Sequence, residues 1–267
     1  MQILIKQNLK KKKMTKNEKE GGFISHLTEL RSRLIHSFIF LFVFFILSYF
    51  FAEYLYGFLV EPYAQAVKND GTERRLIFTA LQETFLTYLK VAFFASFFVT
   101  SPFILIQVWK FIAPGLYDHE KSAIMPYMAI TPILFFLGGA LVYYLIMPLA
   151  IKFFISFESS GHITNLPIQL EAKVNEYLSL IMKLIFAFGL SFQLPVVLSL
   201  LARVGVVDSE FLKKRRKYVV VIIFTAAAIL TPPDPITQIG LAIPLLILYE
   251  LSIFSVSLIE KKSKEDA

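Results

Sequence analysis

The sequence has no cysteine, which excludes disulfides and thiol chemistry. Its four histidines, at positions 26, 36, 119 and 162, are scattered, and no His-Glu-x-x-His motif is present. A zinc site is therefore not expected. Glycine-rich phosphate loops and nucleophile elbows are also missing. We expect no cofactor and no enzymatic activity.

What the sequence has in excess is hydrophobic residues, which make up 56% of its 267 residues and include 28 phenylalanines. The mean hydropathy of +0.64 is too high for a soluble domain. About 20 apolar residues in a helix cross a hydrocarbon core of about 30 Å, and irregular backbone cannot face lipid. The alternating pattern of a membrane β-barrel and any internal repeat are missing. The sequence predicts an all-α membrane protein with six spans, at 34–55, 84–108, 125–146, 177–201, 218–231 and 236–258.

The basic residues are distributed unevenly between the two sides of these predicted spans. Twenty Lys and Arg lie on the side of the termini and five on the other, with Lys90 and Lys183 inside spans near their external ends. The positive-inside rule then places both termini in the cytoplasm. We expect a Lys-rich tail at 1–22, a membrane domain at 23–259 and a second tail at 260–267. We attribute the net charge of +7 to this topology and not to binding of a nucleic acid.

The fifth predicted span is short. Only 14 residues separate Lys217 from Pro232, which corresponds to about 21 Å of helix. The turn that contains Pro232, Pro233 and Asp234 cannot continue a helix. We therefore expect the fifth and sixth helices to be short and to form a hairpin that thins the bilayer.

Two motifs place a carboxylate on the predicted cytoplasmic side among basic residues. Glu29 lies before the first span, and Glu120 follows Asp118 and His119 before the third. Two anionic positions in a cationic field favour a guest with two adjacent positive charges. The alternative is that each is a helix-start acid, with Glu29 paired to Arg33 four residues later.

Several polar residues fall within predicted spans. Gln193 precedes Pro195, and it either has a functional role or forms an inter-helix hydrogen bond. Glu250 is either functional, paired, or close to the cytoplasmic interface, because an isolated carboxylate inside a membrane is costly. For Lys90 and Lys183, snorkelling to the interface is the simplest interpretation.

Four motifs together resemble the TatC family, the core subunit of the twin-arginine protein translocase. They run over nearly the whole chain beyond the N-terminal tail, and their segments are His26–Leu34, Gln107–Glu120, Phe188–Pro195 and Leu230–Asp234. The resemblance implies a curved, glove-like bundle in the bacterial plasma (inner) membrane, or in an organelle membrane of bacterial descent.

The resemblance also implies a function and a set of site residues. The function is binding the Arg-Arg pair of signal peptides and exporting folded proteins with TatA- and TatB-type single-span partners, driven by the proton gradient. We expect a homo-oligomer within a hetero-oligomeric complex. Glu29 and Glu120 match the signal-binding carboxylates, with Phe111 and His119 in the same patch. Gln193 occupies a position where relatives often carry Glu, which keeps hydrogen bonding but removes any proton-carrying role.

Two other functional classes remain as alternatives. A secondary transporter of a small solute could use spans broken by proline, but it predicts two repeated halves, which the sequence does not have. An intramembrane hydrolase would need a catalytic pair, and none is recognisable. Loss of export of a twin-arginine reporter on deletion of the chain would distinguish these classes.

Overall fold

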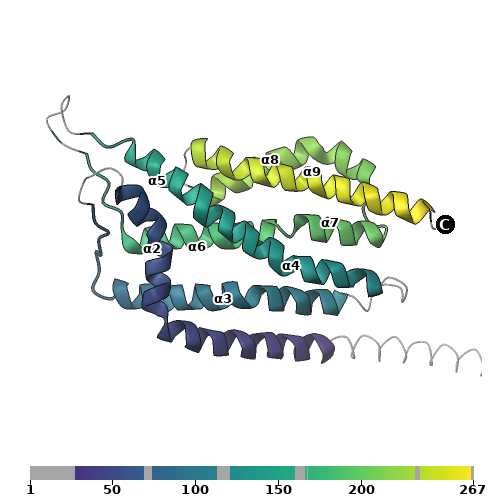
Figure 1. Ribbon diagram of the computed structural model, residues 1–267, viewed down its shortest axis with the longest axis horizontal. Coiled ribbons are helices and arrows are strands. Elements are labelled where there is room, and N and C mark those ends of the chain that lie inside the picture. The colour runs from purple at the N-terminus through teal and green to yellow at the C-terminus, as the bar shows by residue number, and fades with distance from the viewer. Residues whose placement is uncertain are drawn as a thin grey trace, which may run out of the picture.

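A computed structural model describes residues 28–68, 74–112, 121–159, 166, 168–231 and 235–265. Nearly all of them are helical (Figure 1). Among these residues, extended pairing is limited to two isolated bridges, Ile77 with Lys173 and Ser159 with Ile168. The elements are an N-terminal helix Thr28–Phe50, α2 Ala52–Lys68, α3 Glu83–Ile112, α4 Lys121–Leu141, a π-helical turn Val142–Ile146, α5 Met147–Ile155, α6 Val174–Ser191, α7 Leu194–Arg203, α8 Ser209–Leu230 and α9 Pro235–Glu265.

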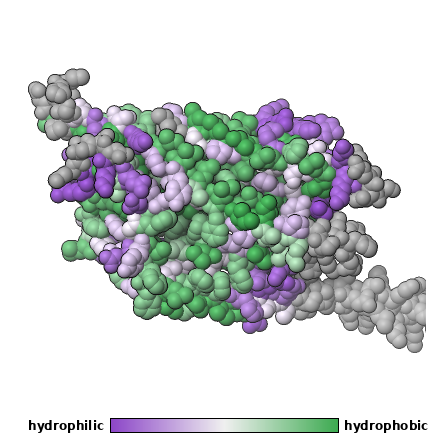
Figure 2. All heavy atoms as spheres, viewed as in Figure 1, coloured by the Kyte–Doolittle hydropathy of each residue, from purple (hydrophilic) through white to green (hydrophobic). Residues whose placement is uncertain are grey.

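The predicted all-helical membrane fold is confirmed. Five helical segments are long and apolar enough to cross a membrane. Figure 2 shows a mainly hydrophobic belt between two ends where polar residues gather. The segments are Thr28–Phe50, Glu83–Phe111, Met125–Ile155, Val174–Arg203 and Thr237–Lys262.

The fifth predicted span, 218–231, lies in α8. Five consecutive basic residues, Lys213–Lys217, stand near the start of this helix. Only the 13 residues that follow them in α8 are apolar enough for a membrane interior. Length and composition therefore support five of the six predicted spans, and α8 is the one they leave open.

The prediction that the sixth helix is short is wrong, because α9 contains 31 residues. α8 contains 22, so its apolar part is short but the helix is not. Lys, Arg and Glu favour helices, and they extend both helices beyond their apolar parts at the same end of the molecule. Ser209 ties these extensions together, since its backbone N–H and its hydroxyl donate to the Glu260 carboxylate at 2.6 and 2.5 Å.

Two further consequences concern the ends of α9. The helix continues through Glu265, so it extends six residues into the segment predicted as a C-terminal tail. The predicted turn residues Pro232, Pro233 and Asp234, which precede α9, lie outside the described residues.

Proline divides the fourth predicted span into two helices. Pro195 has no N–H to donate to the Ser191 carbonyl, so α6 ends at Ser191 and α7 begins at Leu194. Gln193 lies in the turn between them. The break fixes the side chain of Gln193 at a defined depth within the span.

Helices α4 and α6 pack closely because both carry glycine where they meet. A Cβ atom on Gly138 would lie 2.6 Å from the Phe188 carbonyl oxygen, and one on Gly189 would lie 2.7 Å from the Phe135 ring. Phe135 and Phe188 are fully buried at this contact. Small residues let helix backbones approach within a membrane protein, where the hydrophobic effect contributes little to helix association.

Candidate functional site

The candidate site lies at the end of the molecule where the N-terminal helix begins and α3 ends (Figure 1). The start of α4, the start of α8 and the end of α9 lie at the same end. Of the four predicted binding residues, the structure describes Glu29 and Phe111. Glu120 and His119 fall outside the described residues, between α3 and α4.

Glu29 is held by Arg33 one helical turn later. The Glu29 Oε1 atom accepts from Arg33 Nη2 at 2.6 Å and from Nε at 3.1 Å. This pairing is the one that the i, i+4 spacing predicted. Arg33 also reaches α3, where its Nη1 donates to Gln107 Oε1 at 2.9 Å.

The guanidinium of Arg33 therefore joins the N-terminal helix to the end of α3. The sequence analysis placed Gln107 in a family motif but missed this contact, because Arg33 and Gln107 are 74 residues apart on two helices. Gln107 and Phe111 are four residues apart in α3, so they lie on the same helix face. The geometry thus connects Glu29 to the helix face that carries Phe111.

This site is accessible at the surface. The side chains of Glu29 and Arg33 are 34% and 25% exposed. An incoming guanidinium can therefore reach Glu29 and compete with Arg33 for its carboxylate.

Gln193 is buried between α4 and the α6–α7 break, with 4% exposure. Its Nε2 donates to the Thr131 carbonyl at 3.0 Å, which is the inter-helix hydrogen bond considered above. Among the described residues, its Oε1 atom has no hydrogen-bond partner. A buried acceptor left unpaired is costly, so this oxygen calls for an explanation beyond the contacts of the described residues.

Glu250 is paired. Its Oε2 accepts from Arg216 Nη2 of α8 at 2.5 Å, and both side chains are about half exposed. Arg216 belongs to the basic run at the start of α8, so this pair joins α8 to α9 near the polar end. The pairing alternative for Glu250 is therefore the one found.

A second polar cluster lies at the opposite end of the molecule. Arg74, whose side chain is 4% exposed, contacts Glu158 at 2.5 Å, and Glu158 also accepts from the Leu170 backbone N–H at 2.8 Å. The hydrogen bond from Arg74 lowers the pKa of the Glu158 carboxyl below its ordinary value of 4.5. The pair joins the segment before α3 to the segment after α5.

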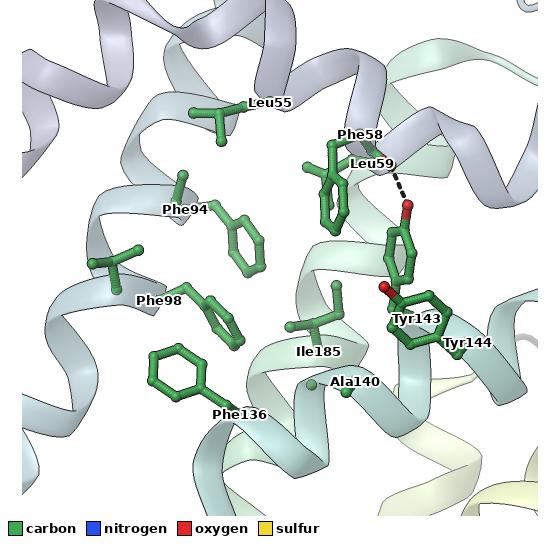
Figure 3. Close-up of a pocket in the computed structure, with 13 residues that line it drawn as sticks. Leu55, Phe58, Leu59, Phe94, Phe98, Phe136, Ala140, Tyr143, Tyr144 and Ile185 are labelled. Carbon is green, nitrogen blue, oxygen red and sulfur yellow. Dashed lines mark hydrogen bonds between the residues drawn. The ribbon is translucent and has the colours of Figure 1, made fainter. Parts of the chain in front are cut away.

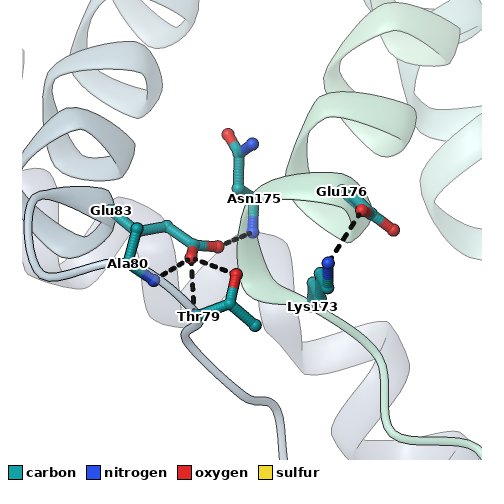
Figure 4. Close-up of polar contacts among 6 residues, drawn as sticks. All are labelled: Thr79, Ala80, Glu83, Lys173, Asn175 and Glu176. Carbon is teal, nitrogen blue, oxygen red and sulfur yellow. Dashed lines mark hydrogen bonds and ion pairs between the residues drawn. The ribbon is translucent and has the colours of Figure 1, made fainter.

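Glu83 organises the start of α3 in the same region (Figure 4). Its carboxylate accepts from the backbone N–H groups of Thr79 at 2.8 Å and Ala80 at 3.2 Å. Lys90, predicted to snorkel, donates to Asn175 Oδ1 of α6 at 2.7 Å. These Glu83 contacts are local, within four residues, whereas the Lys90–Asn175 contact joins residues 85 positions apart and left no signal in the sequence.

Comparison with known proteins agrees with this architecture. The model of the TatC family, described as Sec-independent protein translocase protein, matches residues 25–244. The chain is 48% identical to the Sec-independent protein translocase protein TatC of Magnetococcus marinus, covering 93% of this chain and 88% of that protein. It is 37% identical to the TatC of Escherichia coli K12, with 86% of each covered.

A solved structure, the crystal structure of the twin arginine translocase receptor TatC, superposes with a TM-score of 0.75 at 38% identity. The superposition covers 88% of this chain and 99% of the chain in the solved structure. The resemblance suggested by the four motifs is thus confirmed. The chain belongs to the TatC family of non-enzymatic, inner-membrane components of the Sec-independent protein translocase.

Proposed function

We propose that this chain is the receptor subunit that binds twin-arginine signal peptides, with Glu29 and Glu120 each taking one arginine of the pair. The observation that carries the proposal is the Glu29–Arg33–Gln107 cluster. It shows that the surroundings of Glu29 already hold a guanidinium in charge-assisted hydrogen bonds. Membership of the translocase family does not favour the small-solute transporter.

In this proposal, Arg33 occupies the binding site at Glu29 as long as no signal peptide is bound. A signal arginine that arrives at Glu29 competes with Arg33 for the carboxylate. Because the signal arginine must compete with Arg33, a contact at Glu29 alone gives weak binding, and tight binding also needs the second arginine at Glu120. A peptide with one arginine would then bind weakly, and non-specific capture of basic segments would be limited.

Arginine suits this arrangement better than lysine. A guanidinium offers a planar fork that matches a carboxylate, whereas an ammonium is a compact charge. Phe111 and His119, in the proposed patch, would contact the residues that flank the pair. The half-buried position of Phe111 at the end of α3 is consistent with that role.

The remaining partners are proposed on the same basis. TatA- and TatB-type single-span proteins would contact the membrane-embedded surface, with Gln193 and Glu250 as candidate polar contacts. Gln193 fits this role because its buried Oε1 atom has no partner within the described part of the chain. We propose that the receptor works as a homo-oligomer within this larger complex, in the lipid bilayer.

A binding assay tests the proposal. Purified protein in nanodiscs is titrated with a labelled signal peptide that contains Arg-Arg and with a Lys-Lys version. Each charge-assisted hydrogen bond contributes about 1.5–3 kcal/mol, so Glu29→Ala and Glu120→Ala should each weaken Arg-Arg binding roughly ten- to hundredfold.

Glu53→Ala is the matched control. Glu53 also lies in a first helical turn, at the start of α2, but outside the proposed site. Equal Kd values for the parent protein and the Glu29 and Glu120 variants would reject the proposed site.

A further inference from the structure

An apolar cavity of about 240 Å³ lies between α2, α3 and the junction of α4 with the π-helical turn (Figure 3). Its inner wall is buried and includes Leu59, Tyr143 and Ile185 at 3%, 8% and 4% exposure. The rim is exposed, with Phe58 and Tyr144 at 54% and 72%. The cavity is thus a groove that opens on the hydrophobic surface of the molecule.

The π-helical turn shapes this groove. Pro62 has no N–H to donate to the Phe58 carbonyl, and the hydroxyl of Tyr143 donates to that carbonyl at 2.7 Å instead. The rings of Phe58 and Tyr143 also stack, with centroids 4.4 Å apart. These contacts tie α2 to the π-helical turn beside the groove, and Ala140 on α4 contributes only a methyl group to its lining.

The depth of the groove along the membrane spans determines whether its mouth faces lipid or water. Ala140 is the middle residue of the span Met125–Ile155, and Phe98 lies near the middle of Glu83–Phe111. The mouth therefore faces the hydrocarbon region of a bilayer. A water molecule needs two to four polar partners, and the described lining offers only tyrosine hydroxyls, one of which is already used by Phe58.

The volume of the groove limits which apolar molecules can bind in it. An apolar cavity of about 150 Å³ is known to bind a benzene-sized molecule, so this one has room for a hydrocarbon segment. We propose that the groove binds one acyl chain of a membrane phospholipid and so holds that lipid more tightly than the bulk bilayer does.

The test fills the groove and counts retained lipid. The full chain is purified in mild detergent, supplied with dioleoyl phosphatidylglycerol and analysed by native mass spectrometry. We expect the parent to retain one phospholipid through a detergent wash. Ala140→Leu should reduce the fraction of protein with that lipid at least about threefold, because the new side chain takes the place of the chain's dispersion contacts.

Two further variants make the result specific. Ala129→Leu adds the same methylenes to an exposed site on α4 outside the groove, and it should retain lipid like the parent. Ala95→Leu fills the groove from α3 and replaces Ala140→Leu if that variant does not fold, as judged by circular dichroism.

Three results would overturn the proposal. The parent could retain no lipid, the folded groove variants could retain as much as the parent, or the Ala129 control could lose as much as they do. Unchanged lipid retention with reduced co-purification of a TatA- or TatB-type protein would assign the groove to a partner helix instead.

Discussion

The side-chain amide of Gln193 donates a 3.0 Å hydrogen bond to the backbone carbonyl of Thr131, across the contact between α4 and the α6–α7 break. The bond joins two of the proline-containing spans at a buried position. The oxygen of the same amide has no protein partner among the described residues. Gln193 therefore combines a structural contact with a free acceptor.

Gln193→Leu should leave the protein folded. It removes one hydrogen bond but also an unpaired buried oxygen, so stability should change by no more than about 1 kcal/mol. Export of a twin-arginine reporter should fall, because the proposed polar contact for a partner is lost. Thermal unfolding in detergent and the export assay measure the two effects separately. A variant that exports normally would limit Gln193 to a structural role.

Gln193→Glu should be tolerated if the side chain enters the buried site protonated. A neutral carboxyl group can donate to the Thr131 carbonyl as the amide does, whereas a carboxylate would face that carbonyl with like charge. Export in cells with this variant should remain near the parent level. Loss of export at normal membrane levels would show that the site requires the amide nitrogen.

Gly138→Ala should destabilise the protein by about 1–3 kcal/mol, since the new Cβ would lie 2.6 Å from a backbone oxygen of α6 that cannot move freely. Gly57→Ala is the matched control, because nothing lies within 4 Å of a Cβ at that helical position. It should be neutral or stabilising by about 0.5–1 kcal/mol. Thermal unfolding of both variants in one detergent checks the difference, and equal unfolding temperatures would contradict the close packing.

The Arg74–Glu158 pair should make the end of the molecule opposite the candidate site sensitive to acid. The pKa of Glu158 is lower in the folded protein than its ordinary value of 4.5, so the stabilisation is fully present above pH 4.5 and is lost as pH falls through the folded value. Hydrogen exchange around Leu170 should therefore accelerate below about pH 4.5. Glu158→Gln should remove this dependence on pH, and an unchanged profile in that variant would assign it to other groups.

The sequence predicted most of the fold because apolar length and proline act locally. All six predicted spans fall on helical segments, five of which are long and apolar enough to cross a membrane, and Pro195 lies at the break between α6 and α7. The prediction from sequence failed for the length of α9, because charged residues favour a helix as strongly as apolar ones do. The sequence could not reveal the contacts of Gln107 with Arg33 and of Arg74 with Glu158, because these residues are 74 and 84 positions apart.

A substitution of Arg33 tests directly whether this residue occupies the Glu29 site in the absence of a signal peptide. Arg33→Ala removes the guanidinium from Glu29 and should strengthen binding of a peptide with a single arginine, while Arg31→Ala, on an exposed position of the same helix, should have little effect. Peptide titration in nanodiscs measures both Kd values. Weaker single-arginine binding in Arg33→Ala would mean that Arg33 mainly positions the N-terminal helix against α3.

The measurement closest to the central claim is a double-mutant cycle between the receptor carboxylates and the signal arginines. Parent, Glu29→Ala and Glu120→Ala proteins are titrated with Arg-Arg and Lys-Lys peptides. The account predicts coupling: replacing arginine by lysine should cost less affinity in each variant than in the parent. Strict additivity at both sites, in folded protein, would show that neither carboxylate contacts the arginine pair.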